Sequence, residues 1–343
     1  MLIRFPDPEF AEAFRAYVNY FEDLAGTIGG LYMANSLVEG VHDGVLRHPP
    51  TWKVQRRRLN GPEEKALDAA FRKVWGTLRR LDREVEDPDN YDEEANAWIP
   101  TQAYYAVYHS VLGLSIASGQ TVPRDHAAAL KLAGQVVQRG ALPPPWDAWC
   151  GGCPQTGNCT FGGLSRSGVG VHVLSRPDPW TSDDRLAMFL RTTRQKELER
   201  RFNQERSRKP ALGRTRRNLS RVDKERIASS MAPTTIFDVL WRMRKKANYE
   251  DADTFVLGAA GPLDARRLGQ ALVIVADATT AALEALAAAY VGAKILADMA
   301  EAYRQKTNSA PGSAMGRRAQ SWASRSATLT SQRQTIAAAS AWR

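Results

Sequence analysis

The sequence predicts an all-α protein, an antiparallel helical bundle interrupted by one loop-rich, cysteine-containing and basic insertion. Apolar residues recur at helical spacing along several long segments, as expected of helices that bury one face. Gly140–Thr181 breaks this pattern, because 14 of its 42 residues are Gly or Pro. The chain has 343 residues, 43% of them hydrophobic and 24% charged, which is typical of a globular protein with a substantial core.

The first half of the chain contains a series of predicted helices. Residues 8–47 form a long helix or a helix pair that ends at Pro49, since proline disfavours a helical residue before it. Residues 62–81 form the next helix. Thr101 is expected to cap a third helix that ends at Gly119, and a fourth runs to about residue 139. We assign residues 1–60 to an N-terminal extension and residues 61–139 to the first part of the bundle.

Residues 140–231 form the predicted insertion, and its first feature is a group of cysteines. Cys150, Cys153 and Cys159 follow a C-x2-C-x5-C pattern, and His172 comes thirteen residues later. Three thiolates and an imidazole can complete the tetrahedral coordination of a structural Zn²⁺ ion. Two interpretations stay open, a zinc site at which the sulfurs converge or free cysteines in an ordered loop.

The second feature of the insertion is its positive charge. Residues 185–226 contain fifteen Lys or Arg against five Asp or Glu, so this stretch carries the whole net charge of +10. Arg outnumbers Lys twelve to three there, and Arg suits phosphate recognition. We therefore expect a nucleic acid as partner, with little base stacking because the stretch contains only two aromatic residues. The candidate nucleic-acid contacts are Arg200, Arg201, Arg206, Arg208, Arg214, Arg216, Arg217, Arg244 and Lys245.

Residues 232–306 form the second predicted part of the bundle. Its first helix carries an apolar stripe from Ile236 to Ala247, and Arg242, Lys245 and Tyr249 share a flank away from it. An alanine-rich helix follows and contains acidic residues in its most apolar part, so we expect a bundle helix and no membrane span. Residues 307–343 contain no acidic residue and are expected to be a disordered basic tail or a frayed helix.

Two of these stretches together resemble the HEPN superfamily of small helical domains. They are AYYAVYH at residues 103–109 and RMRKKANYED at residues 242–251. The resemblance covers residues 62–139 and 232–291 and implies that the two motif helices pack together. It also implies a homodimer.

Many nucleases of this superfamily cleave RNA without metal, using an arginine and a histidine that are separated by four to six residues. Arg242 matches that arginine, but Asn248 stands where the histidine is expected. An asparagine can donate and accept hydrogen bonds but cannot act as a general base at pH 7. The catalytic candidates implied by the resemblance are Arg242, Asn248 and Tyr249.

The favoured function is therefore a cytoplasmic, HEPN-like protein that binds nucleic acid, with RNA as the expected ligand. A defence or toxin–antitoxin setting is implied by the resemblance alone. The odd number of clustered cysteines and the absence of an apolar leader in residues 1–10 favour a reducing cytoplasm. Two alternatives remain, a metal-independent endoribonuclease that uses Arg242 and a non-catalytic scaffold whose basic stretch docks an acidic protein partner.

Overall fold

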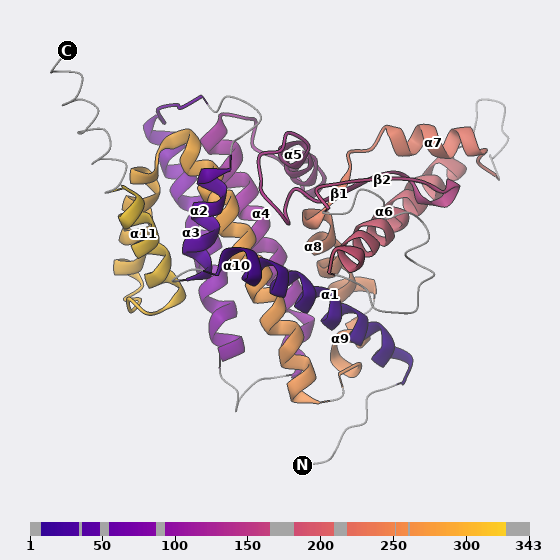
Figure 1. Ribbon diagram of the computed structural model, residues 1–343, viewed down its shortest axis with the longest axis horizontal. Helices are drawn as coiled ribbons and strands as arrows, with labels where there is room; N and C mark the ends of the chain where they lie inside the picture. The colour runs from indigo at the N-terminus through magenta and orange to yellow at the C-terminus, as the bar shows by residue number, and fades with distance from the viewer. Residues whose placement is uncertain are drawn as a thin grey trace.

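The computed structural model confirms the all-α prediction, since helices make up most of the described chain and its three strands are short (Figure 1). The described residues are 8–33, 36–48, 55–86, 93–164, 182–208, 218–250, 252–259 and 261–326.

Helix α10 (Pro262–Val291) runs through the centre of a helical bundle. It packs against five other α-helices, and its apolar side chains Leu272, Val275 and Leu283 are fully buried. It is the one described helix long and apolar enough to cross a membrane, and 83% of its apolar window is buried inside the protein. The five helices are α1 (Pro8–Tyr32), α2 (Leu37–Arg47), α3 (Gly61–Glu86), α4 (Ile99–Ser118) and α11 (Ala293–Lys306), and the other surrounding elements are η1 (Glu93–Ala97) and α5 (His126–Gln138).

Helix α4 illustrates how local sequence signals set the ends of these elements. Gly119 adopts φ 73° and its backbone N–H bonds to Ile116 and Ser115, so it ends the helix as predicted. The helix begins at Ile99, two residues before the predicted cap, with Pro100 in its first turn. Thr101 therefore lies inside the helix, where its side chain is free to bond across to another element.

The insertion consists of a small sheet and two helices that project beyond the bundle, on the right in Figure 1. The antiparallel sheet has the order β2-β1-β3. The C-terminal half of α6 and α7 close a separate small core around Cys153, Leu198 and Phe202. The N-terminal half of α6 packs against α1 instead, where Tyr20 stacks on Phe189. The elements are β1 (Trp149–Cys153), β2 (Asn158–Gly162), α6 (Ser182–Ser207), α7 (Arg221–Ser229) and β3 (Thr234–Thr235).

Helix α8 (Ile236–Lys245) follows β3 and leads into a π-helical turn, η4 (Lys246–Glu250). Asp238 accepts hydrogen bonds from the backbone and side chain of Thr235, which fixes the start of α8. Turns of the π type are frequent at functional sites. A short helix, α9 (Ala252–Leu257), connects this turn toward α10.

The prediction for the C-terminal region was wrong in part, because residues 314–326 form a helix that packs into the bundle. Trp322 is fully buried and Arg318 is 1% exposed. Met315, Ala319 and Trp322 form a short apolar stripe that is buried in the main core. Buried charged residues share this face, and charges at such positions in a sequence are typical of an exposed tail. Residues 327–343 lie outside the described part of the chain.

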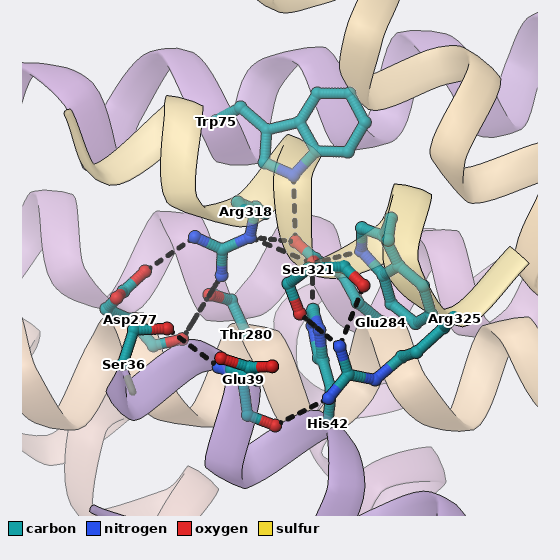
Figure 2. Close-up of polar contacts among 11 residues, drawn as sticks. Ser36, Glu39, His42, Trp75, Asp277, Thr280, Glu284, Arg318, Ser321 and Arg325 are labelled. Atoms are coloured by element: carbon teal, nitrogen blue, oxygen red, sulfur yellow. Dashed lines mark hydrogen bonds and ion pairs between the residues drawn. The ribbon is translucent and has the colours of Figure 1, made fainter. Parts of the chain in front are cut away.

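A buried ionic network joins this helix to the bundle (Figure 2). Arg318 Nε donates to both carboxylate oxygens of Glu284, at 3.0 and 2.9 Å, and Arg318 Nη1 donates to Asp277 at 2.7 Å. Trp75 Nε1 donates to the same Glu284 carboxylate at 2.8 Å. Arg325 bonds to Asp43 of α2 at 2.5 Å. The C-terminal helix is thereby tied to α2, α3 and α10.

Candidate functional site

The two motif stretches meet in the structure, which confirms the predicted packing of α4 against the helix formed by residues 236–245. Thr101 Oγ1 donates to Asn248 Oδ1 at 2.8 Å. Arg244 Nη2 donates to the Tyr105 hydroxyl at 3.2 Å. The contact is thus made by polar and aromatic side chains as well as by the buried apolar stripe.

Arg244 occupies the middle of a group of rings that we call the aromatic–arginine cluster. Its guanidinium carbon lies 4.7 Å from the ring centre of Trp241, 5.4 Å from that of Tyr105 and 5.8 Å from that of Tyr249. These distances are those of cation–π contacts. The cluster consists of Tyr104, Tyr105, Tyr108, His126, Trp241, Arg244 and Tyr249.

His126, the first residue of α5, completes the cluster. Its ring stacks on Trp241 with ring centres 4.6 Å apart, and its Nδ1 is hydrogen-bonded to the Tyr104 hydroxyl at 2.9 Å. Burial and then the nearby Arg244 lower the pKa of His126 below its ordinary value. His126 is therefore a neutral aromatic surface at pH 7.

The cluster has a buried side and a side open to solvent. Tyr104 is 2% exposed and anchors it, whereas Tyr249 is 73% exposed and the other rings are half-buried. An aromatic group that only fills a core is covered on all sides. Here Tyr105, Tyr108, His126, Trp241 and Arg244 keep part of their surface exposed, next to the exposed ring of Tyr249.

Arg242 lies on the opposite side of α8, because residues two apart differ by about 200° around a helix. Its Nη1 donates to the hydroxyls of Thr192 and Thr193 of α6, at 2.9 and 3.1 Å, and its guanidinium lies over the Phe189 ring. Burial lowers the pKa of Arg242 below its ordinary value. Arg242 is thus held between α1 and α6.

The three catalytic candidates therefore do not gather at one point. Arg242 is bonded to α6, Asn248 to Thr101 of α4, and Tyr249 lies against Arg244. The expectation that Arg242 and Tyr249 share a flank assumed a regular helix through residue 250. The π-helical turn from Lys246 changes the angular position of Tyr249.

Lys246 adds a second cation beside Arg242. It is 4% exposed, and its Nζ lies 5.9 Å from the ring centre of Tyr17. Burial, then Lys196 and Arg242, lowers the pKa of Lys246 to about 8. The acidic neighbour Glu250 is itself paired with Lys245 at 3.2 Å. The region between α1, α6 and η4 therefore carries a positive potential that favours an anion.

The described arginines of the basic stretch are less free than their number suggests. Arg200 and Arg201 both bond to Glu197, at 2.6 and 3.3 Å. Arg208 bonds to Glu205 at 3.1 Å, and Arg206 to Asn203 at 3.0 Å. These exposed pairs form a solvated face of α6 whose charge is partly offset. Arg214, Arg216 and Arg217 lie outside the described residues.

The three cysteines do not converge, so that part of the zinc prediction was wrong. Cys150 and Cys159 are diagonal neighbours in the register of β1 and β2, whereas Cys153 lies in the small core with Leu198 and Phe202. Residues three apart on a strand point to opposite faces, which separates Cys150 from Cys153. Among the described residues no three His, Cys, Asp or Glu side chains are placed to hold a metal ion, and His172 lies outside them.

Ser321, His42 and Glu284 form a second polar arrangement of residue types known from hydrolases. His42 Nδ1 lies 2.9 Å from Ser321 Oγ and His42 Nε2 lies 3.4 Å from Glu284 Oε2, longer than a normal hydrogen bond. All three are buried, and Arg325 also donates to Ser321 Oγ at 2.6 Å. Burial lowers the pKa of His42 to about 4. This chain of side chains is part of the ionic network that holds residues 314–326 and has no access for a substrate.

The sequence pointed to Arg244 and Tyr249 but not to the other rings around Arg244. Tyr105 and Tyr108 come from α4, His126 from α5 and Trp241 from α8, and no local pattern links them. The dense aromatic run at residues 104–109 was the available signal. Comparison of the chain with known protein families, with curated proteins and with solved structures finds no match.

Proposed function

We propose that this chain binds single-stranded RNA, with bases stacked on the aromatic–arginine cluster. The observation that carries the proposal is the half-exposed position of Arg244 among Trp241, Tyr105 and Tyr249. Single strands are bound in proteins by exposed aromatic faces and guanidinium planes, because every base offers a π-face. The HEPN resemblance supports the same ligand class.

The electrostatics support an anionic ligand at this place. Arg244 supplies a cation inside the cluster, and Lys245 follows it directly in the chain. The phosphates of a bound strand would lie along these cations and along the exposed arginines of α6. Stacking was expected to be minor from the composition of the basic stretch. In the proposed complex the bases stack on side chains of α4, α5 and α8, and the cations of α6 and α7 attract the phosphates without sequence preference.

Replacing Trp241 or Arg244 with Ala should weaken binding of a single-stranded RNA oligonucleotide. The expected loss is about 1–3 kcal/mol for each variant, roughly 5- to 150-fold in Kd, because one stacked base loses its partner. Fluorescence anisotropy of a labelled oligonucleotide measures it. Trp241→Phe should retain most of the affinity, since it keeps a ring for stacking.

Arg47→Ala is the matched control for Arg244→Ala. Arg47 lies on α2 with its side chain 78% exposed, so its loss removes the same charge away from the cluster. If both arginine variants weaken binding equally, or if wild type binds no RNA, the cluster is not a base-binding surface. An acidic protein partner would then become the leading interpretation of the basic residues.

The salt dependence of binding tests the contribution of the basic stretch separately. Changing Arg214, Arg216 and Arg217 together to Ala should lower the slope of log affinity against log salt by about one for each phosphate that the variant no longer neutralises. Affinity measured from low to physiological salt gives the slope. An unchanged slope would remove these residues from the interface, and cleavage of the RNA by wild type but not by Arg242→Ala would favour the ribonuclease alternative.

A further inference from the structure

Cys150 and Cys159 lie on one face of the β1–β2 hairpin. In its register Cys150 is opposite Phe161 and Cys159 is opposite Gly152, so the two cysteines are diagonal neighbours. Each thiol shifts the pKa of the other, upward for Cys150 and downward for Cys159, as expected of neighbouring sulfurs. Gly152 makes this approach possible, because a Cβ at its position would lie 2.2 Å from the carbonyl oxygen of Asn158. Only glycine fits between the strands here, and it adopts φ 74°.

The two thiols differ in access to solvent. Cys150 is fully buried in the main core, whereas Cys159 is half-buried at its edge. A small solute can therefore reach Cys159 first and finds Cys150 directly behind it. Cys153, on the other face of the hairpin, contacts neither sulfur and is enclosed by the small core.

Two arginines of α6 place positive charge beside this pair. Arg194 is 1% exposed and donates to the carbonyl oxygens of Gly152, Ala232 and Ala228, at 2.6, 3.0 and 2.9 Å. Arg191 lies close enough to Cys159 to lower the pKa of that thiol, and its Nε is buried without a partner among the described residues. Among the described residues, neither the Arg191 guanidinium nor the Arg194 guanidinium forms an ion pair with a carboxylate. A nearby thiolate would supply the missing negative charge.

The groups that face Cys159 all favour its ionised form. The Cys150 thiol, then Arg191 and Arg194, lower the pKa of Cys159 to about 7, against the raising effect of burial. Cys159 in turn raises the pKa of Cys150. Asp238 of α8 acts on Arg194, but it also accepts hydrogen bonds from Thr235. Cys159, the thiol nearer to solvent and to positive charge, is therefore the expected nucleophile of the pair.

We propose that Cys159 and Cys150 form a reversible redox pair that hydrogen peroxide oxidises to an intramolecular disulfide. The Cys159 thiolate attacks one peroxide oxygen, the O–O bond breaks, and Cys159 sulfenic acid and hydroxide are formed. The Cys150 sulfur then attacks the sulfenic sulfur and gives up its proton, so the disulfide forms and water leaves. Two electrons pass from the two sulfurs to one peroxide molecule.

The disulfide of such a pair is of the easily reduced kind. Diagonal neighbours in antiparallel strands have Cα atoms about 7–8 Å apart, more than most disulfides allow. Closing the bond therefore draws β1 and β2 together, and a strained bond is reduced readily by dithiols. Cys150 also pairs with Thr234 of β3, the strand that directly precedes α8. Oxidation thus acts on the start of the helix that carries Arg244.

Oxidation of the reduced full-length chain with hydrogen peroxide, followed by peptide mass mapping, tests the proposal. The expected product is a Cys150–Cys159 link with the loss of two hydrogen atoms, and dithiothreitol should reverse it. In Cys150→Ser the sulfenic acid should persist and be trapped by dimedone at Cys159. Cys153→Ser should behave as wild type. A link that involves Cys153, a link between two chains, or overoxidation of Cys159 without a disulfide would overturn the proposal.

Two further measurements need no variant that might fold poorly. In wild type, iodoacetamide should alkylate Cys159 roughly tenfold faster than Cys153 at pH 7, because the thiolate is the nucleophile. Equal rates would contradict the proposal. Metal analysis of the purified chain tests whether the same thiols bind a metal instead. One zinc ion per chain that is lost in Cys159→Ser would make the pair a metal site and overturn the proposal.

Discussion

Glu284→Ala is expected to lower the free energy of unfolding by about 3–5 kcal/mol, the usual cost of removing one partner from a buried ion pair. Arg318 is 1% exposed and Glu284 is fully buried, so the guanidinium cannot turn to water when its partner is removed. The indole N–H of Trp75 would lose its acceptor as well. Denaturation with urea, followed by circular dichroism, measures the change.

Glu301→Ala is the matched control for this prediction. Hydrogen bonds from Arg304 and Gln305 lower the pKa of Glu301 to about 2, as the network does for Glu284, but Glu301 and Arg304 form their pair at the surface. Solvent screens such a pair, so the loss should stay below about 1 kcal/mol. Equal effects of the two substitutions would show that burial of the Glu284 network contributes nothing special to stability.

Loss of the network should also uncouple residues 314–326 from the bundle. These residues are held by Arg318, Trp322 and Arg325, and two of the three depend on the Glu284 carboxylate. In Glu284→Ala their amide hydrogens should exchange faster than those of α10. Uniform exchange along the chain would mean instead that the helix and the bundle unfold as one unit.

Acidification should destabilise the protein through His42, and replacing His42 with Gln should remove that part of the pH dependence. Burial lowers the pKa of His42 from 6.5 to about 4. Between these pH values His42 binds a proton in the unfolded chain but not in the folded chain, so the free energy of unfolding falls as the pH falls. The full window corresponds to about 3 kcal/mol.

The measurement for His42 is a difference between two proteins, because other buried groups act in the opposite direction. Burial raises the pKa of Asp147 and of Asp238 to about 6, so these carboxyls gain protons more readily in the folded chain and stabilise it as the pH falls. The difference in free energy of unfolding between wild type and His42→Gln cancels the contributions of the two carboxyls. This difference should change with pH between pH 6.5 and about 4 and be constant above pH 6.5.

A pH profile of His42→Gln that follows wild type would contradict a buried neutral histidine. Glu284 extends the acid effect further, because Arg318 and His42 lower its pKa from 4.5 to about 2 against the raising effect of burial. That contribution is lost only as the pH falls below 4.5.

Local sequence signals determined the fold class and most helix ends. A reciprocal hydrogen-bonded box between Ser220 and Asp223 begins α7, and the predicted stop at Gly119 adopts a left-handed conformation. Phe14, Phe21 and Ile28 follow the helical apolar spacing of α1, and all three are buried. Such signals are reliable because capping and one-sided burial involve neighbours within one or two turns of the chain.

The sequence also determined that the two motif stretches meet, but only the tertiary structure decided what their side chains do. Arg242 and Arg244 are two residues apart and face different helices, so one is bonded to threonines and the other is surrounded by rings. The angular position of each residue depends on how α8 crosses α4 and α6, and on the π-helical turn that follows it. Neither the crossing of α8 with its neighbours nor the π-helical turn can be predicted from a local sequence pattern.

The largest differences between sequence and structure have one physical cause. Cys153 leaves the expected cysteine group because strand alternation turns it toward the small core. Residues 314–326 form a packed helix and not the expected tail, because Arg318 forms ion pairs with Glu284 and Asp277 of α10. A charged or polar side chain is stable in the interior only when a distant partner compensates it, and the identity of that partner is set by the fold. Sequence alone therefore determined which residues form helices, and the tertiary structure decided which charges, rings and thiols lie together.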